Sequence, residues 1–161
     1  MKAYLNLSPK EFKSDAGRFS VISPVAMKEM INPQKINGLQ IDQHIFWAAK
    51  NNIGYFVCYS DDPRTLLEQN DPDKVLDACR NGVVSNTNGN LIIETKMLID
   101  GHPGRELLID SKDTKGQDWT TKARVFLVKN RIYSIFINSP KGRISGIEIN
   151  DFLESFKLIE K

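Results

Sequence analysis

The sequence has few of the residues that build metal centres and reactive thiols, with only two histidines and two cysteines in 161 residues. The cysteines, Cys58 and Cys79, match neither a zinc-site nor a thioredoxin spacing. We expect two free, buried thiols, with a single disulfide in an oxidising compartment as the alternative. Nucleophile elbows and glycine-rich phosphate loops are also missing from the sequence. We therefore expect no catalytic residues, no cofactor and no metal.

Long apolar segments are missing as well. No apolar run approaches the roughly 20 residues that cross a bilayer. The first ten residues, MKAYLNLSPK, lack the apolar core of a secretion signal. The sequence indicates a cytoplasmic protein, or one in the periplasm or thylakoid lumen if a leader has been removed.

The composition is that of one folded domain, since hydrophobic residues make up 40% and charged residues 26% of the chain. We predict an N-terminal arm over residues 1–17 and a single domain over residues 18–161. The net charge of +2 is too small to indicate nucleic-acid binding. Residues 112–143 nevertheless hold eight bases and two acids, a local charge of +6. This excess predicts a basic face for an acidic partner or a membrane surface, with a solvated charged face as the alternative; its members are Lys122, Arg124, Arg131, Lys141 and Arg143.

Three β-hairpins are predicted from pairs of strand-forming runs separated by short turns. The first pairs residues 39–50 with 53–60, the second pairs 91–100 with 105–110, and the third pairs 123–128 with 131–137. In the second, the tetrapeptide Gly101-His102-Pro103-Gly104 is interpreted as the turn. In the third, pairing Val128 with Arg131 sets the whole register and gives apolar pairs on both faces.

The remaining elements complete an α+β fold. Short strands are expected at 18–22 and 25–31, the second ended by Asn32-Pro33. A helix is expected at 72–85 after the cap Asp71, with an alternative helix at 63–69, and a last helix at 146–157. Apolar residues on both sheet faces predict an α/β/α sandwich around a mainly antiparallel sheet of about six strands.

The order of these elements resembles the PsbP-like superfamily. The similar motifs are the opening Gly17–Pro24, the strand end Tyr59-Ser60-Asp61, the tip Gly101–Glu106, the turn Asn130–Tyr133 and the closing Phe152–Phe156. This superfamily includes PsbP of photosystem II, DcrB-type bacterial envelope proteins and Mog-type Ran-binding proteins. The tip Gly101–Glu106 is the most distinctive of these motifs and is most similar to bacterial members of unknown role. The resemblance implies a non-enzymatic accessory module that docks on a larger, membrane-associated complex.

Three residues at the tip of the second hairpin are candidate site residues. His102 is either a turn residue or a metal-binding or proton-transfer group, with distant His44 as one further candidate ligand. Arg105 and Glu106 alternate along a strand and face opposite sides, so one of them needs a partner on a covered face. Arg105 is also a candidate anchor for a ligand.

Three functions remain open from the sequence. The first is a non-catalytic assembly or binding module with a protein partner, using the hairpin tips and the basic residues Lys122, Arg124 and Arg131. The second is a binder of a small ligand or anion through Arg105. The third is a metal-assisted hydrolase centred on His102. We expect no nucleic-acid partner.

Overall fold

A computed structural model describes residues 10–36, 38–61 and 71–159, and over these residues the chain has an α+β fold of ten strands and two helices. Seven strands form one antiparallel sheet in the order β3-β4-β5-β9-β8-β7-β6, and three form a small sheet in the order β1-β2-β10. The elements are β1 (Lys10–Ser14), β2 (Phe19–Ser23), β3 (Lys28–Ile36), β4 (Leu39–Lys50), β5 (Ile53–Asp61), α3 (Pro72–Thr87), β6 (Asn90–Ile99), β7 (His102–Lys112), β8 (Asp118–Val128), β9 (Arg131–Pro140), α4 (Gly146–Ser155) and β10 (Lys157–Leu158).

The large sheet therefore has one strand more than the six predicted, and one strand runs past its expected end. β3 continues through Asn32-Pro33, with Pro33 opposite Asp42 of β4. A proline has no backbone N–H to donate to a neighbouring strand, so it does not fit in a central strand. β3 is an edge strand with one neighbour, where a proline is tolerated. At the N-terminus, residues 10–14 of the predicted arm form β1, which pairs with β2.

The first and third hairpins have the predicted turns. Asn51 and Asn52 connect β4 and β5 with φ angles of 54° and 64°, the left-handed conformation of a type I′ turn. In the third hairpin Val128 is opposite Arg131, and the predicted register holds along β8 and β9, which extend to Asp118 and Pro140.

The second hairpin has a different turn from the one predicted. Its turn is Asp100-Gly101, with φ angles of 48° and 81°, and His102 already pairs with Ile99 in the ladder. Gly104 is needed for close packing instead of for a turn, because a Cβ there would be 2.6 Å from the carbonyl oxygen of Val125 and would clash with the edge of the Phe126 ring.

Helices cover opposite faces of the large sheet. α3 packs Val75 and Leu76 against Val125 and Leu127 of β8. Its N-cap Asp71 accepts a hydrogen bond from the backbone N–H of Lys74 at 3.1 Å, as predicted, whereas the alternative helix at 63–69 lies outside the described residues.

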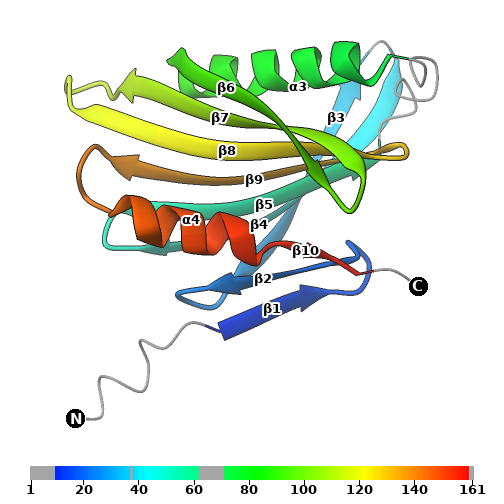
Figure 1. Cartoon of the computed structure of the whole chain (residues 1–161), viewed down its shortest axis with the longest axis horizontal. Coiled ribbons are helices and arrows are strands. Elements are labelled where there is room, and N and C mark those ends of the chain that lie inside the picture. The colour runs from blue at the N-terminus through cyan, green and yellow to red at the C-terminus, as the bar shows by residue number, and fades with distance from the viewer. Residues whose placement is uncertain (1–9, 37, 62–70, 160–161) are drawn as a thin grey trace.

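The other face of the large sheet carries α4 and the small sheet. Phe152 and Phe156, at the predicted helical spacing, pack with Phe19 of β2 in one core. Figure 1 shows α4 close to the small sheet, with α3 apart from both. Neither described helix is long and apolar enough to cross a membrane.

Candidate functional site

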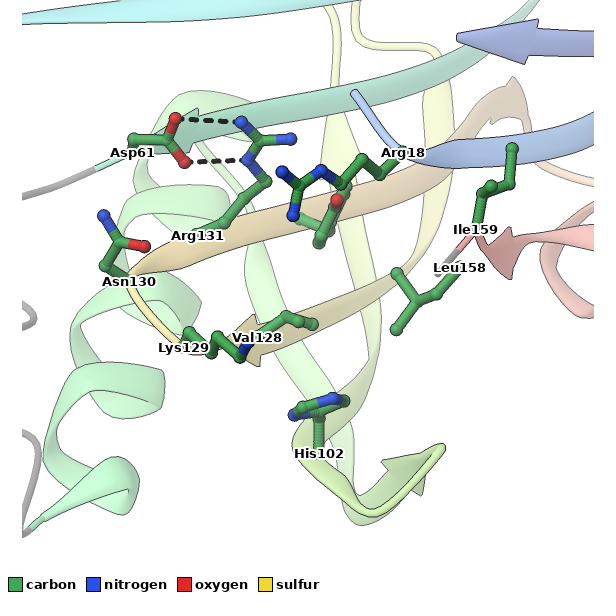
Figure 2. A pocket seen from close by; sticks show the side chains of 10 residues that line it. Arg18, Asp61, His102, Val128, Lys129, Asn130, Arg131, Leu158 and Ile159 are labelled. Atoms are coloured by element: carbon green, nitrogen blue, oxygen red, sulfur yellow. Dashed lines mark hydrogen bonds and ion pairs between the residues drawn. The ribbon is translucent and has the colours of Figure 1, made fainter. Parts of the chain in front are cut away.

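A pocket of about 520 Å³ lies at one end of the large sheet, where several chain segments meet. We call it the turn-end pocket. It is formed by the end of β5, the start of β7, the β8–β9 turn, the residue before β2 and the segment after α4 (Figure 2). The lining residues are Arg18, Asp61, His102, Val128, Lys129, Asn130, Arg131, Tyr133, Leu158 and Ile159.

Pro103 explains why there is space between β7 and β8 here. The β7–β8 ladder runs from Lys112 opposite Asp118 to Gly104 opposite Phe126, and it stops there. Pro103, the next residue, has no N–H to donate, so the ladder cannot continue through it. His102 and Val128, which would otherwise be neighbours in the ladder, instead both line the pocket.

Arg131 is held rigidly on one side of the pocket. Its Nε and Nη2 donate to the two carboxylate oxygens of Asp61 at 2.7 and 2.9 Å. Its Nη1 donates to the carbonyl of Ala16 at 3.1 Å, and the guanidinium lies 4.4 Å from the ring centroid of Tyr59. The hydrogen bonds from Arg131 hold the pKa of Asp61 below its usual value. Arg131 and Asp61 thus form a charged pair on one side of the pocket.

Two further cations in the pocket have no such partner. Arg18 and Lys129 are exposed, and within the described part of the chain their side chains make no hydrogen bond or ion pair. Both also have left-handed backbones, with φ angles of 56° and 59°, which ordinary residues adopt at a cost. Glycine or asparagine would fit these positions better, so the charges occupy turns whose backbone does not favour them.

Of the titratable groups that share the pocket with His102, the acidic ones, Asp61 and Tyr133, are already hydrogen-bonded. Asp61 is bonded to Arg131, and the hydroxyl of Tyr133 donates to the carbonyl of Gly17 at 2.5 Å. Burial raises the pKa of Tyr133. The side chain of His102 makes no hydrogen bond or ion pair with any described residue.

A metal site at His102 has no support in the geometry. Over the described ranges, no three His, Cys, Asp or Glu side chains gather in a metal-binding cluster. His44 is stacked on Tyr59 with ring centroids 4.5 Å apart, and its strand is four positions from that of His102. At about 4.8 Å per strand, roughly 19 Å separates the two along the sheet. Cys58 and Cys79 are not joined in a disulfide, and Cys58 is buried as predicted, whereas Cys79 is only partly buried.

Arg105 is not in the pocket. It lies beneath α3 with 4% of its side chain exposed and makes ion pairs with Asp73 at 3.0 Å, Asp77 at 2.8 Å and Glu94 at 2.6 Å. These pairs are the structural salt bridge expected for a charged side chain on a covered face. Its Nε is buried without a hydrogen-bond partner.

Glu106 faces the opposite side, as predicted, and gathers two of the predicted basic residues. Arg124 donates from Nε to Glu106 at 2.8 Å, and the ammonium of Lys122 is 3.6 Å from the same carboxylate. Lys122 also donates to the side chain of Asn150 on α4 at 2.9 Å. The predicted basic face is therefore divided, with Lys122 and Arg124 in this group and Arg131 in the pocket.

Among the predicted site residues, the structure places only His102 and Arg131 in the pocket. Glu106, Lys122 and Arg124 form a separate group, and Arg105 lies beneath α3. The sequence prediction missed the contributions of Arg18 and Lys129. A signal was present, because Lys129 stands in a predicted two-residue turn where glycine or asparagine is preferred. Nothing in the sequence shows that this turn meets Arg18 or Asp61.

No protein-family model matches the sequence, and no curated protein does. Among solved structures, cyanobacterial PsbP (CyanoP) from Synechocystis sp. PCC 6803 is similar, with a TM-score of 0.61 at 13% identity over 94% of this chain and 93% of that one. A protein from Bacteroides thetaiotaomicron VPI-5482 is similar with a TM-score of 0.51 at 15% identity. The match covers 94% of this chain but only 49% of the Bacteroides protein. The chain therefore has the predicted PsbP-like fold.

Proposed function

We propose that this protein is a non-catalytic binding module, acting as an accessory or assembly factor, that holds an anionic group of its partner in the turn-end pocket. The observation that carries the proposal is the excess of positive charge among the described lining residues. Arg18, Lys129 and Arg131 face one carboxylate, Asp61, so the fixed charge is +2. Cations without partners in a concave site attract and concentrate anions.

Arg105, the anchor predicted from the sequence, is a poor candidate for this task. Its guanidinium is 4% exposed and already makes ion pairs with three carboxylates, so it is not accessible to an added anion. The hydrolase hypothesis needs a second titratable group that cooperates with His102. Asp61 and Tyr133 are both engaged elsewhere, so no observation favours it. The likeness to cyanobacterial PsbP shows the PsbP-like fold, and this fold is compatible with the accessory role that the resemblance in the sequence implies.

The proposal is tested by following backbone amides in ¹H–¹⁵N NMR while malonate is added to the full chain at constant ionic strength. Shifts are expected at Arg18, His102 and Lys129. The double variant Arg18→Ala, Lys129→Gln should bind malonate roughly tenfold or more weakly, because two charge-assisted contacts are lost.

The matched control is the double variant Arg143→Ala, Lys115→Gln. It removes the same charges from exposed residues at the opposite end of the large sheet, beyond β9 and between β7 and β8. It should bind malonate as the unmodified protein does. Equal weakening in both variants, or shifts scattered over the surface, would show that the pocket is not an anion site.

A further inference from the structure

We infer that the anionic group is a carboxylate in an acidic peptide segment of a protein partner, which lies extended in the turn-end pocket with an apolar side chain beside the acid. This inference rests on the proposed function and specifies the ligand of the same site. Four features of the pocket support it: its two-sided chemistry, its size, the open edge of β10 and a described lining without helix residues or glycines.

The pocket has a charged side and an apolar side. Figure 2 shows Lys129 and Arg131 towards one side and Leu158 and Ile159 towards the other, with Arg18 and His102 across the space from each other. An isolated inorganic anion would use only the charged side. A ligand that carries an acid next to an aliphatic or aromatic group fills both.

The volume also exceeds what a single anionic group needs. Pockets of roughly 300–1,000 Å³ bury ligands of drug size, which corresponds to several side chains of a peptide. At about 520 Å³ the turn-end pocket is in this range. A short peptide stretch therefore fits the space, whereas a phosphate or carboxylate group alone would leave most of it empty.

The edge of β10 provides backbone groups, beside the charges, that pair with no strand of the described chain. β10 is the outer strand of the small sheet, with Leu158 opposite Phe19 of β2. The N–H of Ile159 donates to the carbonyl of Arg18 at 2.8 Å, so it points towards β2. Successive residues of an antiparallel strand point their N–H and C=O groups in opposite directions, so those of Leu158 point away from β2. Because Leu158 and Ile159 both line the pocket, an extended peptide there can pair with this edge.

The described lining lacks the features that commonly build phosphate sites. Such sites use backbone N–H groups at helix N-termini or in glycine-rich loops. None of the described lining residues belongs to a helix, and none of them is a glycine. The described lining offers cationic side chains instead, which bind a carboxylate through charge-assisted hydrogen bonds.

The inference is tested by selecting from a displayed library of random peptides on the full chain. Enriched peptides should carry Asp or Glu within two positions of an apolar residue. Enrichment should disappear on the Arg18→Ala, Lys129→Gln variant and remain on the Arg143→Ala, Lys115→Gln control. In synthetic copies of the selected peptides, Glu→Gln should weaken binding roughly tenfold or more. Methylation of the backbone nitrogen that pairs with Leu158 should weaken it further.

The outcomes separate this inference from the proposed function. If malonate shifts the pocket amides but the selected peptides lack acids, or bind the double variant equally well, the peptide inference is wrong and the anion site stands. The same holds if the unmodified protein binds vesicles of phosphatidylglycerol and the double variant does not, while no acidic peptide is enriched. If malonate causes no shift in the pocket, both fail.

Discussion

Replacing Lys129 with asparagine should make the protein more stable and at the same time a weaker binder. Lys129 has a φ angle of 59°, in the left-handed region that costs an ordinary residue roughly 1–2 kcal/mol. Asparagine is several-fold enriched in this conformation. The β4–β5 turn of the same chain has an asparagine at the corresponding first turn position, Asn51 with a φ angle of 54°, so Lys129→Asn introduces a residue type that the chain already uses in this conformation.

The expected gain in stability follows from the preference of asparagine for the left-handed conformation. A three- to five-fold enrichment corresponds to about 0.6–1 kcal/mol in the free energy of unfolding at 25 °C. In a chain of this length, about 1 kcal/mol raises the melting temperature by roughly 2–4 °C. Loss of the Lys129 charge also relieves repulsion from Arg18 and Arg131 in the same pocket. The variant Lys129→Gln measures that part by itself, because glutamine lacks the left-handed preference of asparagine.

The assay is urea unfolding followed by circular dichroism, at about 0.15 M salt, together with binding of the malonate probe. Both variants should bind malonate more weakly than the unmodified protein, and only Lys129→Asn should show the additional stability. If Lys129→Asn is no more stable than Lys129→Gln, the backbone argument is wrong. If either variant binds malonate as tightly as the unmodified protein, Lys129 is not kept in this turn for recognition.

Four other changes have expected outcomes that the structure sets. Arg105→Ala should lower the free energy of unfolding, measured in urea, by about 2–3 kcal/mol. This loss is smaller than is usual for breaking a fully buried ion pair, because the partners Asp73 and Asp77 are half exposed. A loss under about 0.5 kcal/mol would contradict this. Gly104→Ala should cost about 1–3 kcal/mol through overpacking against Phe126, and an unchanged stability would refute the packing argument. Burial raises the pKa of Cys58 to about 12, so its thiol should resist iodoacetamide at pH 8 until the protein unfolds, and alkylation at the rate of a free thiol would overturn this. Because Arg131 lowers the pKa of Asp61, the stability from this pair is present above the ordinary value of 3.8 and is lost as the pH falls through the lower folded pKa. Asp61→Asn should make the free energy of unfolding less dependent on pH in this acidic range. An unchanged pH dependence would show that the Asp61–Arg131 pair does not contribute to stability.

Local interactions determined the parts of this fold that the sequence predicts correctly. The β8–β9 register follows from the two-residue turn Lys129-Asn130, because a side-chain period of two leaves one arrangement with apolar pairs on both faces. The cap Asp71 and the apolar stripe after it are likewise local patterns, and together they predict α3. The PsbP-like fold follows from the order of such elements.

Which residues form the turn-end pocket is determined by the tertiary structure alone. Arg18, Asp61, His102 and Lys129 belong to four separate segments, and they meet because β5 pairs with β9 and β10 pairs with β2 across long stretches of chain. The tip of the second hairpin looks like the site in the sequence because its residues are adjacent there. In the folded chain the alternation of β7 sends Arg105 to the carboxylates beneath α3 and leaves His102 in the pocket. Which charged side chains lack a partner depends on non-local packing, and no local pattern in the sequence contains that information.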